Sequence, residues 1–218
     1  MTSIDLDQLM QLLASGQGRR DEIPNQMLAK SIAAQGDKQA VAGLVSLLDH
    51  KRNAVQNDAI KTLYEIGALH PHLLAPHRDV FLRILKQKNN RLQWGAMTAL
   101  QTIAEVDPAG IYNHLGTILE VADNGSVITR DQAVMILIRL ASIPDYHTTA
   151  IVLLLEQLSR APENQLPMYA ERSLPILQQA DCQEFIQVLT SRWPAMTSPT
   201  KKKRVEKVIT QLHKRFNL

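Results

Sequence analysis

Aliphatic residues recur along this chain with a period of 37 residues. Each copy of the pattern has an alanine, a leucine four places later and a further aliphatic residue seven places later. The four copies are Ala59, Leu63 and Ile66; Ala96, Leu100 and Ile103; Ala133, Leu137 and Leu140; and Ala170, Leu174 and Leu177. Spacings of four and seven place these positions on one face of an α-helix. The pattern therefore predicts one amphipathic helix in each unit.

A second apolar column with the same period precedes the first. Its members are Leu44, Phe81, Ile118 and Leu155. Polar segments at residues 49–53, 88–90 and 123–126 lie between the two columns, as a tight helix–helix turn requires. Prolines fall between the units, where they are tolerated, at Pro71, Pro76, Pro108 and Pro144. Each unit is thus predicted to be a helical hairpin.

The N-terminal end departs from the repeat. Residues 1–36 contain two amphipathic segments, 3–14 and 24–35, whose spacing does not follow the consensus. Ser3 is the expected N-cap of the first segment, and Gly36 is expected to end the second. Atypical terminal helices are typical of repeat arrays, because they cover the first hydrophobic face.

The C-terminal end is irregular as well. Regular units are expected over residues 37–181, and a fifth, altered unit over residues 182–218, with Val205, Ile209 and Leu212 as its apolar positions. A helix is expected to start at Cys182. Pro175 lies inside the second helix of unit four and is predicted to kink it.

Composition supports an all-α fold. The chain is 45% hydrophobic but only 4% aromatic, which suits close helix packing by Leu, Ile, Val and Ala. We therefore predict a single domain over residues 1–218, an all-α, right-handed α-solenoid. It would contain about five helical hairpins and two N-terminal capping helices.

The unit from Leu44 to Ile66 resembles a HEAT repeat. The residues that carry the resemblance are Leu44, Leu47, Leu48, Asp49, Val55, Ala59, Leu63 and Ile66. The resemblance covers about residues 37–212, although Gln56 and Gln93 stand where a basic residue, present as Arg130 in unit three, is usual. It implies an ARM/HEAT-like scaffold that binds other macromolecules along a concave face formed by the second helix of each repeat.

Charge is unevenly distributed. The net charge is +3, but residues 198–218 carry +6, so the remainder of the chain sums to −3. The basic character therefore belongs to the C-terminal segment, and it does not indicate nucleic-acid binding by the whole protein.

Several functional classes lack support in the sequence. The motifs of phosphate-binding loops, nucleophile elbows, zinc proteases and dinucleotide folds are absent. Cys182 is the only cysteine, and His70, His72 and His77 are interpreted as surface histidines and not as a metal site. No secretory signal or membrane-spanning run is present. We expect a cytoplasmic protein without cofactor, metal or membrane partner, and its oligomeric state stays open.

Candidate partner-binding residues lie beside the core stripe of the second helices. They are Lys61, Tyr64, Arg91, Trp94, Arg130, Asp131, Tyr169 and Arg172. Trp94 is the main candidate, because a tryptophan exposed on a concave ridge is a typical interface hot spot. Alternatively, Trp94 packs against adjacent turns.

The leading hypothesis is a non-enzymatic scaffold or adaptor that binds a protein or peptide. A further possibility is an assembly or regulatory subunit whose array is fused or docked to an enzyme. The alternative is nucleic-acid binding through the basic C-terminal helix, for which the candidate anion-binding residues are Lys201, Lys202, Lys203, Arg204 and Lys207. This basic run is also consistent with a solvated capping helix.

An enzymatic form of the nucleic-acid hypothesis has weaker support. Alkylpurine DNA glycosylases resemble this chain in size and architecture, which would imply a carboxylate one turn from Trp94. Thr98 stands at that position, and Asp131 is the nearest substitute.

Overall fold

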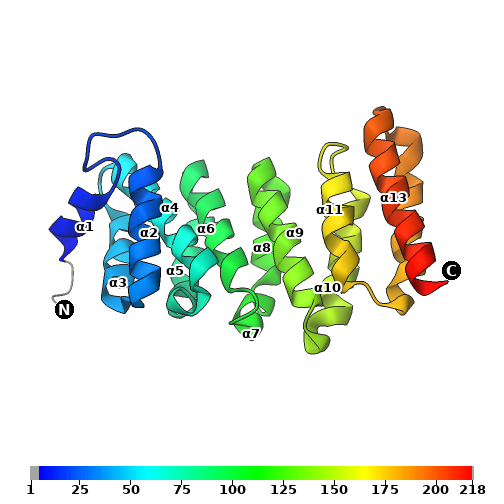
Figure 1. Cartoon of the computed structure of the whole chain (residues 1–218), viewed down its shortest axis with the longest axis horizontal. Coiled ribbons are helices and arrows are strands. Elements are labelled where there is room, and N and C mark those ends of the chain that lie inside the picture. The colour runs from blue at the N-terminus through cyan, green and yellow to red at the C-terminus, as the bar shows by residue number, and fades with distance from the viewer. Residues whose placement is uncertain (1–4, 218) are drawn as a thin grey trace. The chain divides into compact units, whose positions relative to one another are not determined.

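The computed structural model describes residues 5–217. These residues form thirteen α-helices joined by short 3₁₀ turns, and the described part contains no β-strand (Figure 1). The chain divides into two compact units, residues 1–133 and residues 134–218, with the division inside helix α9. Each unit is described separately below.

Unit 1 contains α1 to α8 and the first half of α9. The helices are α1 (Leu6–Leu12), α2 (Ile23–Gln35), α3 (Lys38–Ser46), α4 (Asn53–Leu69), α5 (Arg78–Leu85), α6 (Asn90–Ile103), α7 (Pro108–Tyr112), α8 (Leu115–Asn124) and α9 (Val127–Ala141). Helix α4 packs between α2 and α6, while α5 packs against α6 and α8. The predicted hairpins are therefore present, and α2, α4 and α6 form a row of neighbouring helices.

Unit 2 contains the second half of α9 and four further helices. These are α10 (Pro144–Ser159), α11 (Leu166–Ser173), α12 (Cys182–Arg192) and α13 (Pro199–Phe216). Helix α10 packs against α11 and α12, and α13 packs against the same two helices. The 3₁₀ turns of the two units are η1 (Leu47–Asp49), η2 (Pro71–Leu73), η3 (Ala75–His77), η4 (Leu174–Ile176), η5 (Gln179–Asp181) and η6 (Trp193–Ala195).

Both repeating columns lie in the core. The four anchoring alanines, Ala59, Ala96, Ala133 and Ala170, are 0% exposed. The earlier column is buried too, at Leu44, Phe81, Ile118 and Leu155. Small residues at the anchor positions allow neighbouring helices to approach closely, so the period in the sequence reflects this packing.

The ends of the capping helices agree in part with expectation. Gly36 ends α2 in a left-handed conformation with φ of 64°, as predicted. The side chain of Asp5 accepts a hydrogen bond from the backbone N–H of Gln8 at 2.8 Å and thereby caps α1. Ser3, the expected N-cap, lies outside the described residues. Cys182 begins α12, as predicted.

The prediction for Pro175 was wrong. Helix α11 ends at Ser173 instead of continuing through a kink, and η4 follows it. Pro175 has no N–H to donate to the preceding turn, so the helical ladder stops there. The carbonyl of Leu174 accepts a hydrogen bond of 2.9 Å from Arg215 of α13, so the interrupted segment is held by another helix.

Candidate functional site

Six side chains from three neighbouring segments of unit 1 meet beside α4 and α6. We call them the aromatic–charge cluster, and its members are Glu22, Lys61, Tyr64, Glu65, Arg91 and Trp94. The rings of Tyr64 and Trp94 are half-buried, with centroids 6.0 Å apart and planes tilted by 48°. Two large aromatic rings thus form one partly exposed surface across adjacent helices.

The packing of α4 on α6 brings these two rings together. Gly95 follows Trp94 directly, and a Cβ atom at this position would lie only 2.6 Å from Cγ1 of Ile60. The absence of a side chain at Gly95 therefore lets α4 approach α6 closely. Tyr64 is one turn after Ile60, so this contact sets the distance between Tyr64 and Trp94.

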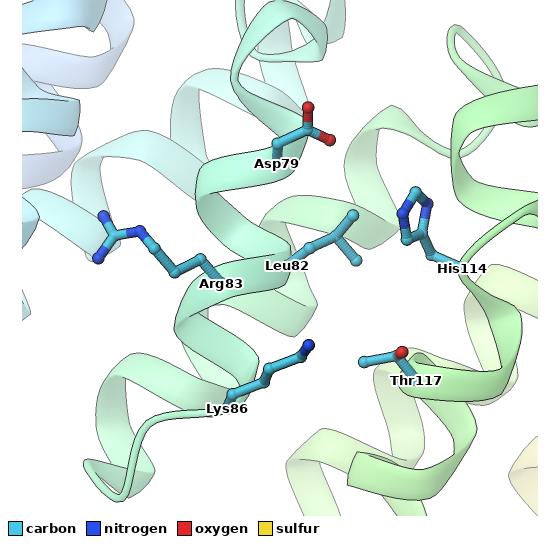
Figure 2. Close-up of a pocket in the computed structure, with 6 residues that line it drawn as sticks. All are labelled: Asp79, Leu82, Arg83, Lys86, His114 and Thr117. Carbon is cyan, nitrogen blue, oxygen red and sulfur yellow. The ribbon is translucent and has the colours of Figure 1, made fainter.

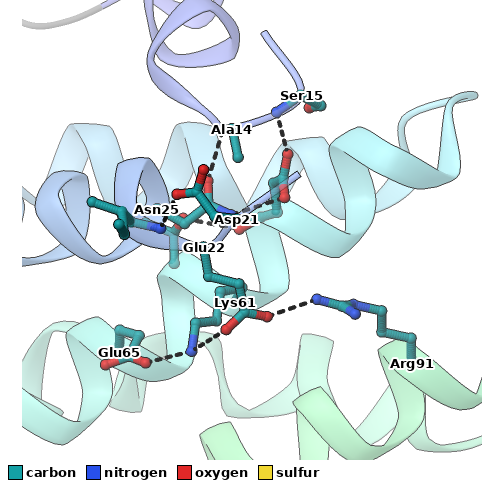
Figure 3. A network of polar contacts seen from close by, with 11 residues as sticks. Ala14, Ser15, Asp21, Glu22, Asn25, Lys61, Glu65 and Arg91 are labelled. Carbon is teal, nitrogen blue, oxygen red and sulfur yellow. Dashed lines mark hydrogen bonds and ion pairs between the residues drawn. The ribbon is translucent and has the colours of Figure 1, made fainter. Parts of the chain in front are cut away.

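Lys61 is the central charge of the cluster. Its side chain is only 8% exposed, and Nζ lies 3.0 Å from Glu22 and 2.6 Å from Glu65 (Figure 3). The same atom lies 4.9 Å from the centroid of the Tyr64 ring. Burial acts to lower the pKa of Lys61, but hydrogen bonds to Glu65 and Glu22 outweigh it and raise this pKa above its usual value. Lys61 is therefore a permanent cation.

Glu22 connects Lys61 to the second cation of the cluster. Its other carboxylate oxygen accepts a hydrogen bond of 3.0 Å from Arg91 (Figure 3). The guanidinium carbon of Arg91 lies 5.7 Å from the centroid of the Trp94 ring, within the range of a cation–π interaction. Each aromatic ring of the cluster is thus accompanied by one cation, and both cations share Glu22.

Two buried polar atoms near the cluster have no hydrogen-bond partner among the described residues. They are Oδ1 of Asn57, on α4, and Nε of Arg91, on α6. Buried polar groups are usually paired, and leaving one unpaired costs about 1–3 kcal/mol. Both atoms are buried, so a partner can reach them only if the side chains that cover them move.

Glu22 was missed by the sequence analysis. It stands immediately before α2, in the N-terminal segment that does not follow the repeat, so no register connected it with α4 or α6. A second network ties the same segment to α4: the side chain of Asp58 accepts 2.7 and 2.8 Å hydrogen bonds from Ser15 and Asn25. The capping segment thus contributes to the cluster as well as covering the core.

Two expected surface residues are buried. Tyr169 is 1% exposed and belongs to the core of unit 2, so the expectation that it faces a partner was wrong. It lies directly before the anchor Ala170, close enough to the core stripe for a large ring to turn inward. Lys61 is also buried, and it positions Glu22 and Glu65.

The remaining candidates on α9 and α11 are accessible. Arg130 is half-buried on α9 and donates a 3.2 Å hydrogen bond to the carbonyl of Asp123. Asp131 is half-buried as well. Arg172 is exposed on α11, with Nη1 3.3 Å from the sulfur of Met135. None of these three residues contributes to the aromatic–charge cluster.

The predicted anion-binding residues of α13 separate into two groups. Arg204 forms a two-pronged ion pair with Glu171, with distances of 2.8 and 2.6 Å, and Lys201 donates a hydrogen bond to the side chain of Asn164. These two side chains attach α13 to the rest of unit 2. Lys202, Lys203 and Lys207 form no hydrogen bond or ion pair with any residue in the range 5–217.

Solved structures with a similar fold are repeat proteins. A designed armadillo repeat protein in complex with the peptide (KR)4 aligns with a TM-score of 0.65 and 16% identity, covering 95% of this chain and 99% of that one. An engineered protein gives a TM-score of 0.59 at 20% identity over 98% of each chain. The archaeal HEAT-like repeats protein from Thermococcus onnurineus NA1 gives 0.54 at 15% identity, over 99% and 100%. The chain has a HEAT/ARM-like repeat fold.

This repeat fold confirms the predicted all-α solenoid class and the resemblance to HEAT repeats. Sequence comparison adds no family, since no family model and no curated protein matches the chain. At these identities the likeness establishes the fold alone.

A depression between α5 and α8 has a volume of about 320 Å³ (Figure 2). Asp79, Leu82, Arg83, Lys86, His114 and Thr117 line it. Arg83 pairs with Asp49 at 2.9 Å, and the ring of His114 makes a 2.8 Å hydrogen bond with the carbonyl of Gly110. Arg83 and His114 are therefore engaged with the protein itself, and no hydrogen bond among the described residues joins the Thr117 hydroxyl to His114 or Asp79, as an activated nucleophile would require.

Metal binding, thiol chemistry and membrane insertion find little support in residues 5–217. Within this range no group of three or more His, Cys, Asp or Glu side chains could hold a metal ion. Burial, with a smaller effect from Asp181, raises the pKa of the Cys182 thiol, which disfavours the reactive thiolate. No helix in the described part is both long and apolar enough to span a bilayer.

The three histidines of the α4–α5 connection differ in exposure. His72 is exposed, whereas His70 and His77 are half-buried. All three therefore retain exposed surface in the loop. Burial lowers the pKa of His77, which favours its neutral form.

Proposed function

We propose that this chain is a non-enzymatic scaffold or adaptor that binds a protein or peptide partner through the aromatic–charge cluster. The observation that carries the proposal is the Tyr64–Trp94 pair, half-buried and bordered by Arg91. Tyrosine, tryptophan and arginine are the residues most enriched at interface hot spots. A rigid helical support lowers the entropy lost on binding.

The polar atoms of the cluster suit an extended peptide segment. A peptide backbone offers N–H donors and C=O acceptors at regular intervals. Asn57 Oδ1 and Arg91 Nε have no partner among the described residues, and they can pair with such a backbone once the side chains that cover them move aside. Because Lys61 and Arg91 balance Glu22 and Glu65, the cluster is close to neutral, and aromatic contact and backbone pairing would dominate recognition.

Proteins of similar fold support a peptide as the kind of partner. One designed armadillo repeat protein is in complex with the peptide (KR)4, and another was designed for modular peptide recognition. We extend to this chain only the general use of such a fold as a peptide-binding scaffold. Cytoplasmic location, as expected from the sequence, is part of the proposal.

Selection from a random peptide library displayed on phage would test the proposal directly. The purified full-length chain would serve as bait, and the affinities of selected peptides would be measured by fluorescence. The protein has two tryptophans, Trp94 and Trp193, so Trp193→Phe leaves Trp94 as the single reporter at the site. We expect a selected peptide to change the emission of Trp94.

Trp94→Ala should weaken the selected peptides by at least about tenfold, which corresponds to about 1.4 kcal/mol. Trp193→Ala is the matched control, because Trp193 is a half-buried tryptophan outside the cluster. Circular dichroism would verify that both variants remain helical. Peptides that bind the two variants equally well would contradict the proposal, and so would a library that yields no binder.

A further inference from the structure

The outer face of α13 carries a row of exposed lysines. Its members are Lys203, Lys207 and Lys214, all exposed, and we call them the lysine row. At 100° per residue, positions separated by four and eleven lie within about 40° of each other around a helix. The three side chains therefore project from one narrow strip about 16 Å long.

The lysine row points away from the core of unit 2. The buried residues of α13 are Val205, Val208, Ile209 and Leu212, which lie on the opposite side of the helix. The cations that bind α11 and its neighbouring turns are Lys201, Arg204 and Arg215, and none of them belongs to the row. The packing of α13 therefore uses a different set of cations from the row.

The charges of the row are not neutralised by ion pairs. None of its three lysines forms a hydrogen bond or ion pair within residues 5–217, although Lys207 contributes to the lowered pKa of Glu171. Glu206 is the only acidic residue of α13. Four cations near the N-terminal end also oppose the helix dipole, at a cost of a few tenths of a kcal/mol each. An anionic partner would relieve both effects.

We propose that the lysine row binds an acidic α-helix of a protein partner. Along the axis of α13, Lys203 and Lys207 are about 6 Å apart, and Lys207 and Lys214 are about 10 Å apart. Carboxylates at positions i, i+4 and i+11 of a second helix have the same separations, so each lysine can face one carboxylate when the helices lie side by side. The inference concerns unit 2 and does not rest on the aromatic–charge cluster.

Two other anionic surfaces fit the row less well. An amphipathic helix that inserts into a membrane needs an exposed apolar face, whereas Val205, Val208, Ile209 and Leu212 of α13 are buried, so only charge would hold the row to a membrane. Duplex nucleic acid presents phosphates from two strands, whereas the row is a single side chain wide and is bordered by Glu206. A helix with one acidic stripe matches this width.

Fluorescence anisotropy with a labelled alanine-rich peptide, carrying Glu at positions i, i+4, i+7 and i+11, would test the proposal. A peptide of the same composition with scrambled Glu positions is its control. At about 50 mM salt, where screening is weak, we expect the full chain to bind the patterned peptide at least threefold more tightly than the scrambled one. Binding should weaken at about 300 mM salt.

Matched charge-reversal variants distinguish an effect of the lysine row from an effect of the net charge of the protein. The variant K203E/K207E/K214E should bind the patterned peptide at least tenfold more weakly than the wild type. The control K30E/K51E/K88E makes the same charge change at exposed lysines of unit 1 and should stay within threefold. Glutamate and lysine have similar helix propensities, so α13 should remain folded, which circular dichroism would verify.

Several results would overturn the proposal: no binding at low salt, equal losses in the two triple variants, or equal affinity for patterned and scrambled peptides. Tighter binding to a random 20-base-pair duplex, or to vesicles containing phosphatidylserine, would overturn it as well and assign the row to that partner. Trp94→Ala should leave the binding of the patterned peptide unchanged. A failure of the lysine-row proposal can therefore be distinguished from a failure of the proposed function.

Discussion

The Nζ atom of Lys61 lies 3.0 Å from a carboxylate oxygen of Glu22, which stands in a different structural segment. This contact attaches the start of α2 to the middle of α4. Because Glu22 also accepts a hydrogen bond from Arg91 of α6, a single carboxylate holds both cations beside the aromatic pair. The geometry of the proposed binding surface therefore depends on Lys61, although Lys61 itself is buried.

Lys61→Met should destabilise unit 1 by about 1–3 kcal/mol. Removing one partner of a fully buried ion pair costs about 3–5 kcal/mol, and we reduce this figure because the side chains of Glu22 and Glu65 are 43% and 30% exposed. Urea denaturation followed by circular dichroism would measure the loss. Arg83→Gln is the control, since its pair with Asp49 is exposed and should contribute less than about 1 kcal/mol. Equal losses in the two variants would contradict this interpretation.

Gly95→Ala should both destabilise the protein and weaken the aromatic pair. The added methyl group would lie 2.6 Å from Ile60, so α4 and α6 must separate, at a cost of about 1–3 kcal/mol. Part of this cost is offset by the higher helix propensity of alanine, about 1 kcal/mol. We expect a lower unfolding temperature and a red shift in the emission of Trp94, measured in the Trp193→Phe background.

Gly116→Ala provides the comparison for that substitution. A Cβ atom at Gly116, in α8, would meet no other atom within 4 Å, so alanine should stabilise the helix by up to about 1 kcal/mol. The two glycine variants should therefore shift stability in opposite directions. A stabilised Gly95→Ala protein would show that the α4–α6 contact tolerates a larger residue.

Periodicity predicted the fold because packing in a repeat array is local. Each anchor alanine is fully buried, so the same constraint returns in every unit, and Ala59 and Ala96 could be recognised as equivalent positions. Pro175 shows the limit of this reasoning. A column establishes that a position is apolar, but whether a proline bends a helix or ends it depends on nearby groups such as Arg215.

The candidate site could be predicted only in part. Trp94, Tyr64 and Arg91 were among the predicted positions beside the core stripe, and the packing of α4 on α6 brings them together. Glu22 could not be predicted, since it comes from a segment outside the repeat register. Tyr169 was wrongly predicted to face a partner, because its place in the repeat does not distinguish a surface position from one at the edge of the core. At the edge of the core, a large ring gains more free energy by burial.

Arg204→Gln should reduce the acid sensitivity of unit 2. The hydrogen bond from Arg204 lowers the pKa of Glu171, so the pair contributes stability above the ordinary carboxyl pKa, and this contribution is lost as the pH falls through the lowered value. Both side chains are partly exposed, which limits the contribution to at most about 1 kcal/mol. Urea midpoints at neutral pH and at about pH 3 would measure it, with Lys203→Gln as the control. An Arg204→Gln protein that retains the full acid sensitivity of the wild type would exclude this pair as its source.

His77→Gln should make unit 1 less sensitive to mild acid. Burial lowers the pKa of His77 in the folded protein, so protonation favours the unfolded chain. The stability present above the ordinary histidine pKa, about 6.5, is therefore lost progressively as the pH falls below it. Unfolding temperatures between pH 7.5 and pH 5 should decline less steeply in His77→Gln than in the wild type. His72→Gln removes an exposed histidine from the same connection and should leave the slope unchanged. If the two variants behave alike, the acid sensitivity arises elsewhere in the chain.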